Sequence, residues 1–443
     1  MRMITRRRFL AGSIATAVGS VIPHELFAGS ARNTRVVIVT DENAVSGSTV
    51  YADIVRQMVN AGIKQLTGQP TIGSAWYSLL PGITSSSKVS LKENNSNGER
   101  WEPRKAVVHP CVTDAVVQGL RQMPLGAMPI PLESIMVWDL DKAPIVGSGY
   151  TINLGGPGVQ VYYAVEDYRV WTNDYSGPGI GNDLVGDGLG FSMSSICTID
   201  HPFPTPDSSH HPATIITDYT DYMINVGVLG YHSDAQITGV LKNHYGSFDN
   251  IRIGSMHGSG ISRGIPGLSA YLRDSFDNIQ RVFMIDGLFG CCQYGPQAAV
   301  DCVPKTIILG TDPVAVDYQM TQVLNYYRSL VGAPPLNPAH VNAAAGAPFN
   351  LGTNNPANID LVQITNPSVP PAQVQNVRST TVGSDVVLDW DAVAGVSNYN
   401  VYRHSIAYPQ APGTLIGSTV GATFTHVGVA GEPFGFYTVT AEY

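Results

Sequence analysis

Charged side chains are scarce in this chain and make up only 13% of its 443 residues. Lysine and arginine number 25 against 34 acidic residues, so the formal net charge is −9. A chain that is acidic overall and has no basic cluster after the arginines at residues 6–8 is a poor partner for nucleic acid and is not drawn to anionic lipid. Both classes of partner are therefore excluded from the leading interpretations.

Several motifs that identify common enzyme classes are also absent from the sequence. It contains no Walker phosphate loop, no GxSxG nucleophile elbow and no GxGxxG after a strand. Its histidines show neither HxH nor HExxH spacing, and the acidic segment at residues 177–190 lacks the order of ligands found in calcium loops. A divalent metal bound by histidine and aspartate remains open, because neutral imidazoles and carboxylates are suitable ligands at any spacing that the fold brings together.

Cysteine is infrequent, and its five positions include no CxxC pair: Cys111, Cys197, Cys291, Cys292 and Cys302. An iron–sulfur cluster or a zinc ribbon needs spaced thiolates directed at one point, so neither is predicted. The adjacent Cys291 and Cys292 cannot easily bridge each other. We interpret the cysteines mainly as small, semi-buried residues. The alternative is that Cys302 pairs with one of the other cysteines outside the cytoplasm.

No hydrophobic run after the N-terminus is long enough to cross a bilayer. The run at residues 9–22 is interrupted by glycine and serine and is shorter than the roughly 20 residues that a span needs. It follows TRRRFL at residues 5–10, which resembles the twin-arginine export signal. We therefore expect residues 1–31 to be a cleaved signal peptide. The resemblance implies the twin-arginine translocase as a partner and a periplasmic or secreted location.

Apolar runs of strand length alternate with helical patterns after this signal, which is typical of an α/β domain with a mostly parallel sheet, flanking helices and long loops. Such a domain is predicted over residues 35–364. The expected strands are residues 35–40, 88–92, 134–138, 223–229, 281–285 and 306–309. The expected helices are residues 50–66, 113–123, 268–277 and 313–330.

A second, all-β unit is predicted at residues 373–443, after a proline-rich linker at residues 365–372. Short alternating strands are separated by turns, and Trp390 lies in an LDW segment. With the runs at residues 399–403 and 437–441, this segment resembles a fibronectin type III domain, a small immunoglobulin-like sandwich. Such a domain would need one more strand after Tyr443. The sandwich is therefore expected to be truncated, or the chain to be a fragment.

Polar residues follow most of the apolar runs. Lys92, Asp139 and Asp286 come at or just after three of the predicted strands, and Asp312 follows another. Because ligands bind beyond the carboxyl ends of parallel strands, these residues are expected to converge on one edge as a metal, phosphate or acid–base site. Each has a structural alternative: Asp312 before Pro313 is typical of a helix N-cap, and Asp286 before a glycine is typical of a turn.

A helix over residues 233–244 would place Asp234, Thr238 and Lys242 on one polar stripe directly after a predicted strand. Its amide groups, the hydroxyl and the ammonium would face an anion, while His244 would turn toward the core. The alternative is a solvated stripe with a weak Asp–Lys pair, worth a few tenths of a kcal/mol.

Longer segments resemble the domain of unknown function 362 family: INVGVLGYHSDAQITGVLKNHYG from residue 224, MIDGLFG from residue 284 and ILGTDPVAVD from residue 308. KVSLKENN, VVHPCVTDAVVQGL and IMVWD earlier in the chain agree with it. The resemblance spans residues 35–364 and implies site residues at Lys92, His232, Thr238, Lys242, Asn243, His257, Asp286, Asp312 and Asp317. Many relatives also carry iron–sulfur segments, which this sequence lacks, and Gly230 replaces a lysine usual in the family.

Two functions from different classes follow. The first is an exported enzyme, redox-related or cofactor-dependent, that holds an anionic or metal-containing ligand. Lys242 and Thr238 would orient the anion, His232 would act as acid and base, and Asp286 with Asp312 would bind metal or protons. The second is a non-catalytic extracytoplasmic protein that contacts a cell-surface polysaccharide or protein through its C-terminal module.

Overall fold

A computed structural model describes residues 33–99, 104–126, 128–165, 197–198, 209–210, 213–247, 260–296, 298–368, 374, 376–393, 398–404, 414–431 and 435–442. The expected signal peptide at residues 1–31 and residues 369–372 of the predicted linker lie outside these ranges, as does His257. None of the helices in the described ranges is long and apolar enough to cross a membrane.

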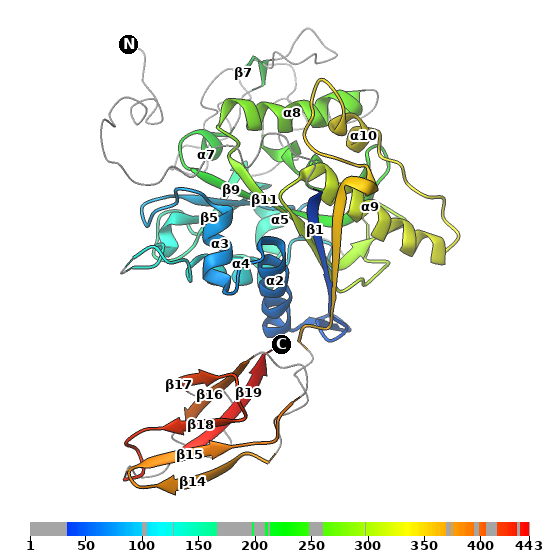
Figure 1. Cartoon of the computed structure of the whole chain (residues 1–443). Helices are drawn as coiled ribbons and strands as arrows, with labels where there is room; N and C mark the ends of the chain where they lie inside the picture. The colour runs from blue at the N-terminus through cyan, green and yellow to red at the C-terminus, as the bar shows by residue number, and fades with distance from the viewer. Residues whose placement is uncertain are drawn as a thin grey trace, which may run out of the picture. The chain divides into compact units, whose positions relative to one another are not determined.

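The centre of the chain is a nine-stranded mixed sheet (Figure 1). Its spatial order is β13 (Ile359–Thr365), β1 (Thr34–Thr40), β12 (Thr306–Gly310), β11 (Gln280–Cys291), β9 (Tyr222–His232), β4 (Val89–Lys92), β5 (Ile135–Asp141) and β6 (Gln160–Val165), with β10 (Gln236–Ile237) paired to β9. Within this sheet, β12 runs against its two neighbours and β10 runs against β9. All other neighbours are parallel, so the predicted mostly parallel α/β fold is confirmed.

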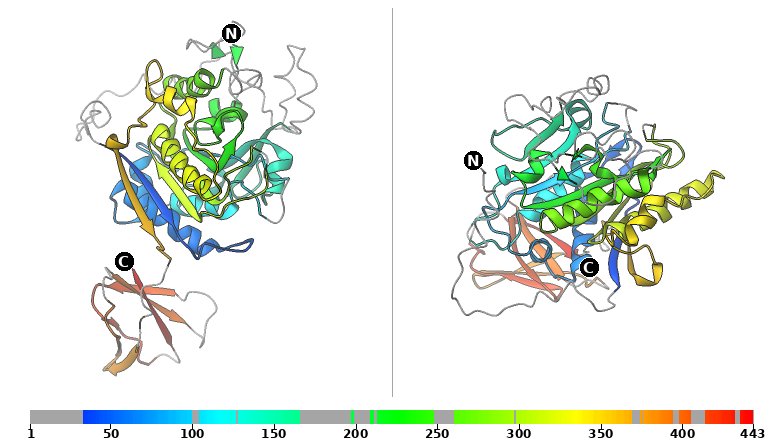
Figure 2. Two further views of the ribbon diagram at one scale, coloured as in Figure 1. Left: turned by 90° about the vertical axis from the view of Figure 1, so that its right-hand side faces the viewer. Right: turned by 90° about the horizontal axis from the view of Figure 1, so that it is seen from above.

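Two hydrophobic clusters, one on each face, show how the strands alternate. In β1, Val37 and Val39 belong to one cluster and Val36 and Ile38 to the other, as the period of two in a strand requires. Because both faces are covered, the central strands read as continuous apolar runs. Figure 2 gives two further views of this arrangement. The sheet is therefore the middle layer of three.

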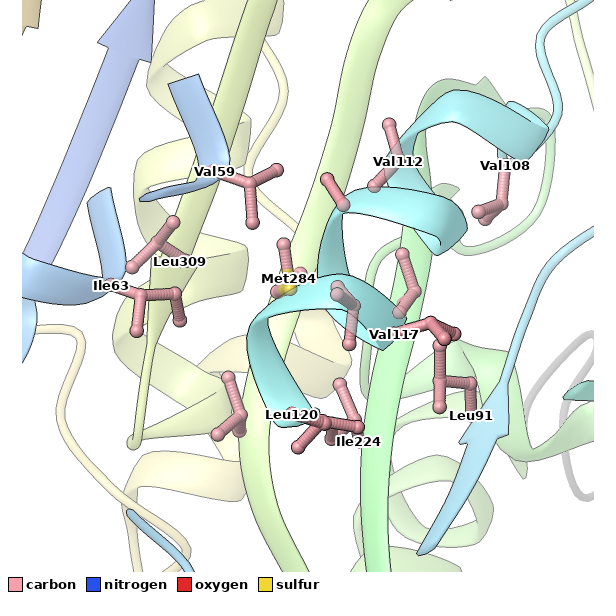
Figure 3. Close-up of a cluster of buried hydrophobic side chains, with 14 of the residues drawn as sticks. Val59, Ile63, Leu91, Val108, Val112, Val117, Leu120, Ile224, Met284 and Leu309 are labelled. Atoms are coloured by element: carbon pink, nitrogen blue, oxygen red, sulfur yellow. The ribbon is translucent and has the colours of Figure 1, made fainter. Parts of the chain in front are cut away.

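The cluster that contains Val37 and Val39 is covered by α2 (Ala52–Thr67), α3 (Ile72–Leu79) and α4 (Pro110–Leu120). Figure 3 shows the apolar side chains of α4 packed over Leu91, Ile224 and Met284 of three neighbouring strands. The cluster that contains Val36 and Ile38 is covered by α8 (Ile261–Ser275), α9 (Pro313–Leu330) and α10 (Ala339–Ala345). We call these the α4 face and the α9 face of the sheet.

The remaining elements of this part are short. They are β2 (Val45–Ser46), β3 (Thr49–Val50), η2 (Leu132–Ser134), α5 (Lys142–Gly147), β7 (Cys197–Thr198), β8 (Ser209–His210), α7 (Thr214–Thr217), η4 (Lys242–Gly246) and η6 (Pro356–Asn358).

The helix considered over residues 233–244 does not form. The chain turns back at once, and β10 pairs with the end of β9 as a tight hairpin. The Nδ1 atom of His232 accepts the amide N–H groups of Asp234 (3.0 Å) and Ala235 (3.2 Å) and so holds the turn. Gln236 has a positive φ of 68°, which a helix excludes. Only η4, a single 3₁₀ turn, remains helical.

Cysteine pairing also differs from our main interpretation. Cys292, beside the end of β11, forms a disulfide with Cys302, ten residues later. The structure therefore contains the alternative that we considered, in which Cys302 pairs with another cysteine. Cys111 and Cys291 are free thiols.

The C-terminal region forms two three-stranded antiparallel sheets. One has the order β14 (Arg378–Val382), β15 (Asp385–Asp389) and β18 (Thr423–His426), and the other has β17 (Thr414–Thr419), β16 (Asn398–His404) and β19 (Phe436–Glu442). Both contribute to one small core of four buried residues: Leu388, Trp390, Tyr399 and Val401. The predicted all-β architecture of this region is confirmed.

We expect Leu120→Ala, on the α4 face, to lower the free energy of unfolding by about 2–5 kcal/mol, because it leaves a cavity among fully buried side chains. The matched control is Leu330→Ala at the end of α9, where the leucine is 63% exposed and the cost should stay below about 0.5 kcal/mol. Urea unfolding followed by far-ultraviolet circular dichroism measures both, and equal losses would contradict the assignment of the core.

Candidate functional site

The site predicted at the carboxyl ends of the parallel strands is divided between the two faces of the sheet. Lys92 and Asn243 meet on the α9 face, while the Asp286 carboxyl contacts the amino end of α4 on the other face. Side chains alternate along a strand, so residues at one edge can lie on opposite faces.

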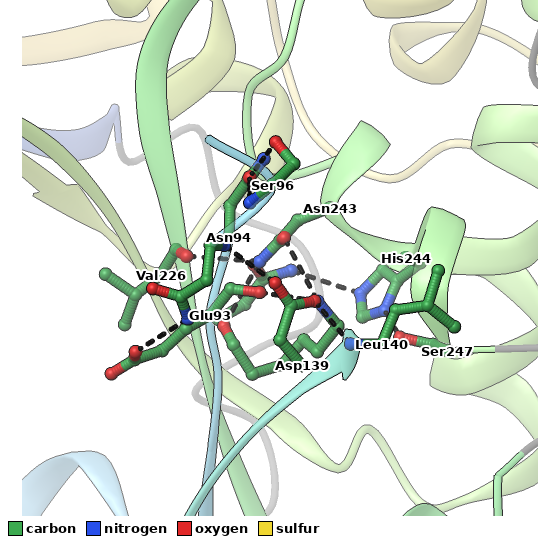
Figure 4. Close-up of polar contacts among 12 residues, drawn as sticks. Glu93, Asn94, Ser96, Asp139, Leu140, Val226, Asn243, His244 and Ser247 are labelled. Atoms are coloured by element: carbon green, nitrogen blue, oxygen red, sulfur yellow. Dashed lines mark hydrogen bonds and ion pairs between the residues drawn. The ribbon is translucent and has the colours of Figure 1, made fainter. Parts of the chain in front are cut away.

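Lys92 is buried at the end of β4 with only 1% of its surface exposed. Two of its partners, Asp139 and Asn243, are shown in the network of polar contacts in Figure 4. Its Nζ atom donates to the Asp139 carboxylate at 2.7 Å and to the Asn243 side-chain oxygen at 3.3 Å. It also donates to the backbone carbonyl of Glu93 and lies 5.4 Å from the centre of the Trp138 ring. A buried charge requires partners of this kind, so β4, β5 and η4 meet around one ammonium group.

The contacts continue from Asn243 across β9 toward His244. The Asn243 amide donates to Asn225 (2.8 Å), and the Asn225 amide donates to Gln280 (3.0 Å). The Gln280 oxygen also accepts from the His244 ring at 2.8 Å, and the other ring nitrogen bonds Ser247. Burial lowers the pKa of His244 to about 3, so this ring is neutral and structural. The predicted orientation of His244 toward the core is confirmed.

Thr238 and Asp317 hold the segment that leads into η4. The Thr238 hydroxyl donates to the Val228 carbonyl of β9 at 2.8 Å. The Asp317 carboxylate, on α9, accepts the N–H groups of Val240 (2.7 Å) and Leu241 (3.0 Å). Asp317 is fully buried, which raises its pKa to about 7. It does not face solvent, and its contacts fix the backbone before η4.

Lys242 and His340 form a second buried polar group on the α9 face. Burial lowers the pKa of Lys242 to about 8, and the nearby Asp234 opposes this shift. His340 on α10 is fully buried, and burial followed by the charge of Lys242 lowers its pKa to about 3. His340 is absent from the residues picked out by sequence, because a single histidine in an alanine-rich helix gives no signal.

On the α4 face, Glu93 is buried among hydroxyl groups. Its carboxyl accepts a hydrogen bond from Thr113 on α4, whose hydroxyl lies 2.6 Å from that of Tyr150. Burial raises the pKa of Glu93 to about 7, although these hydroxyl groups act in the opposite direction. Glu93 was missed by sequence reasoning, which stopped at the preceding lysine.

Asp286, in β11, contacts the same end of α4. One carboxyl oxygen accepts the N–H of His109, the N-cap residue of α4, at 2.8 Å, and the other accepts that of Leu288 at 2.9 Å. Burial raises the pKa of Asp286 to about 7. Glu93 and Asp286 both influence the buried Tyr150, whose pKa is raised chiefly by burial. The two carboxyls and Tyr150 therefore make one electrostatic unit.

A cleft of about 580 Å³ opens between the segment that follows Asn95 and helix α5. It is lined by Lys105, Lys142 and Glu99 together with backbone and small side chains. The Lys105 ammonium donates to the carbonyls of Gly98 and Gly147, both at 2.6 Å, and so joins the two walls. The cleft has two cationic residues against one acidic residue, a balance that favours an anion.

Asp312 lies at the opposite edge of the sheet, and the prediction that it joins the others is wrong. Because β12 runs antiparallel, its last residue, Gly310, pairs with Val36 and Phe283 near the starts of β1 and β11. Asp312 caps α9 by accepting the N–H groups of Val314 and Ala315, each at 2.9 Å. This is the N-cap alternative considered from the sequence.

Comparisons with known proteins find a family resemblance over one part of the chain. The model of a family described as Domain of unknown function (DUF362) matches residues 207–322. No curated protein matches the chain. A solved structure named "Structure of FN3tt mut" shares 14% identity over 17% of this chain and 82% of that one, with a TM-score of 0.15. A score this low supports no statement about the C-terminal fold.

We expect Asp139→Asn to lower the free energy of unfolding by about 3–5 kcal/mol, because it leaves the buried Lys92 ammonium without its counter-charge. The matched control is Asp274→Asn. Asp274 pairs with Arg273 at 2.7 Å, but both side chains are over one third exposed, so the cost should stay below about 1 kcal/mol. Urea unfolding compares the two, and a cost for Asp139→Asn no larger than the control's would refute a structural role for the pair.

A second expectation concerns pH. The folded-state pKa of Glu93 lies above its ordinary value of 4.5, at about 7. The stability that its protonated form contributes is therefore fully present below pH 4.5 and lost as the pH rises through 7. Glu93→Gln should reduce the decline in unfolding free energy between about pH 5 and pH 8.

The control for this measurement is Glu133→Gln. Glu133 is exposed, and the N–H of Gly158 lowers its pKa, so this substitution should leave the slope over the same pH range unchanged. An identical slope in wild type and Glu93→Gln would show that Glu93 is ionised throughout.

Proposed function

We propose that this chain binds a small anionic ligand at the carboxyl edge of its sheet and acts on it as an acid–base enzyme. The observation that supports this most directly is the pair of buried carboxyls, Glu93 and Asp286, each with a pKa raised to about 7. Strongly shifted pKa values at strand ends are more frequent in functional sites than in purely structural ones.

A pKa near 7 suits proton transfer, because such a group exchanges protons in both directions at neutral pH. Glu93 contacts the Thr113 hydroxyl, which lies 2.6 Å from the Tyr150 hydroxyl. Under the proposal, this chain of hydroxyl groups carries the proton between the buried carboxyl and a ligand. Asp286 accepts a hydrogen bond from the backbone N–H of His109, and its negative charge helps to raise the pKa of Tyr150.

Lys105 and Lys142 are the residues we assign to binding the anion, because both line the cleft beside α5. The sequence prediction gave this role to Lys242 and Thr238. Thr238 is committed to backbone carbonyls of β9, and Lys242 lies with His340 on the other face. His232 keeps a candidate proton role, since its Nδ1 accepts two amide groups and its Nε2 therefore carries the proton.

The proposal places this enzyme outside the cytoplasm, after export by the twin-arginine translocase. The twin-arginine pattern at residues 5–10 supports it, as does the disulfide between Cys292 and Cys302, which persists in oxidising compartments.

A second candidate is a non-catalytic binding protein that uses the C-terminal sheets, which we compare with a fibronectin type III module. The observation that favours it is the number of large apolar side chains exposed on these sheets and their turns: Val382, Leu415, Val420 and Val427. Exposed apolar side chains in one region are typical of contact surfaces.

The experiment that separates these functions is native mass spectrometry, with elemental analysis, of protein exported through its own signal. We expect a small anion that is retained or rebinds from a panel of phosphate, sulfate and carboxylate compounds. Lys142→Ala should weaken this binding at least about tenfold, a loss of about 1.4 kcal/mol. The control Lys64→Ala, in the last turn of α2, should leave it unchanged.

Deletion of residues 370–443 completes the test. The acid–base proposal requires the truncated chain to keep its anion. Binding that disappears with the C-terminal sheets, or that survives Lys142→Ala intact, would instead favour the second candidate.

A further inference from the structure

Three metal-type ligands gather in the loop between β11 and β12. One ligand atom from each of Cys292, Asp301 and Cys302 lies within 4.8 Å of the other two. In the part of the chain that the structure describes, no other three cysteine, histidine or acidic side chains meet in this way. The two sulfurs form a disulfide in this structure, so the group is present in its oxidised form.

Backbone contacts hold the three residues independently of the disulfide. Gly290 and Cys302 form an isolated antiparallel bridge, with N–O distances of 2.9 and 3.2 Å. The Asp301 carboxylate accepts the N–H groups of Cys292 (2.5 Å) and Gln293 (2.9 Å). Arg328 on α9 donates to the Cys292 carbonyl at 2.7 Å. Reduction would therefore leave both thiols and the carboxylate close together.

The neighbouring Cys291 does not belong to this group. Its Sγ donates to the carbonyls of Ala298 and Ala299, at 3.3 and 3.5 Å, and burial raises its pKa to about 12. Adjacent residues of a strand point to opposite sides, which explains why only Cys292 faces Cys302. The exposed Asp301 gives the group an opening to solvent, the entry path that a metal site requires.

We propose that the reduced loop binds one zinc ion through Cys292, Asp301 and Cys302, and that the disulfide is the metal-free, oxidised form of the same site. Two thiolates and a carboxylate suit zinc, and three protein ligands leave the fourth tetrahedral position for water or a substrate atom. Tetrahedral zinc separates two sulfur ligands by roughly 3.8 Å. The Cα atoms lie 6.2 Å apart, which leaves room for that separation through side-chain rotation.

The interconversion balances as two steps. A dithiol reductant gives two electrons and two protons to the disulfide, so that the S–S bond breaks, two thiols form, and the reductant becomes a disulfide. Zinc then replaces the two thiol protons, which are released to solvent, and forms two Zn–S bonds. Oxidation reverses both steps and expels the metal.

This site would affect the carboxyl edge, because the loop rests on it. The Asn97 amide, after β4, donates to the Pro296 carbonyl at 3.1 Å. A Cβ atom at Gly295 would lie 2.0 Å from the carbonyl oxygen of Tyr231 at the end of β9, so the loop backbone presses directly on that strand. Reduction and metal binding would therefore alter the loop between β11 and β12 that packs against this edge of the sheet.

The test uses the purified full chain, reduced with a phosphine under anaerobic conditions and titrated with cobalt(II) as a spectroscopic substitute for zinc. We expect thiolate-to-cobalt charge-transfer absorption at one equivalent, displaced by one equivalent of zinc, and one zinc per chain in native mass spectrometry. The oxidised chain should show neither. Cys302→Ser should weaken binding at least about 100-fold, and Asp301→Asn about 10-fold or more.

Cys111→Ser, which removes a free thiol on α4, is the matched control and should bind like wild type. Asp301→Asn keeps both cysteines, and far-ultraviolet circular dichroism of each reduced protein checks its fold, so a misfolded Cys302→Ser variant would not decide the outcome. The proposal is overturned if the folded, reduced chain shows no charge-transfer band, if Asp301→Asn binds like wild type, or if the oxidised chain binds equally well.

Discussion

The buried ammonium of Lys92 is the interaction on which the centre of this structure depends. A charge with 1% exposure is stable only with close partners, and here these come from three separate segments. Asp139 neutralises it, Asn243 links it to β9, and the carbonyl of Glu93 completes its hydrogen bonds. Because these partners must all reach one point, the ends of β4 and β5 and the turn η4 have little freedom. Because Glu93 directly follows Lys92 in the chain, the same contacts also restrict the backbone of Glu93, which belongs to the electrostatic unit on the other face.

The sheet separates two kinds of polar chemistry. On the α9 face, asparagine, glutamine and a neutral histidine satisfy one another, and Asp317 is committed to two backbone N–H groups. Such fully bonded networks specify one arrangement of the core. On the α4 face, burial raises the pKa of Glu93 and Asp286 to about 7. Groups poised near neutrality can exchange protons, so the α4 face is the more suitable place for chemistry.

The segment matched by the family model and the electrostatic unit of Glu93, Asp286 and Tyr150 overlap only in part. Residues 207–322 include His232, Thr238, Lys242 and Asp286, but Lys92 and Glu93 lie earlier in the chain. One part of the matched segment forms the hairpin of β9 and β10 and the turn η4, where Asp317 and Thr238 fix the backbone. The match to the family model in this region therefore reflects residues that pack and fix this loop as well as residues that could bind a ligand. The loop of Cys292 and Cys302 lies in the same segment and adds a redox-dependent element to it.

The sequence alone determined the α/β class, because long apolar runs can be buried only between two helical layers. It also indicated the burial of His244 and the edge position of Lys92, which follow from apolar neighbours and strand ends. It could not determine the direction of β12, which places Asp312 at the far edge, because periodicity is the same in either direction. It left a helix possible where His232 and the positive φ of Gln236 make a hairpin. Glu93 became a candidate only through α4, since the raised pKa of a carboxyl is a property of its enclosure, and enclosure exists only in the folded chain.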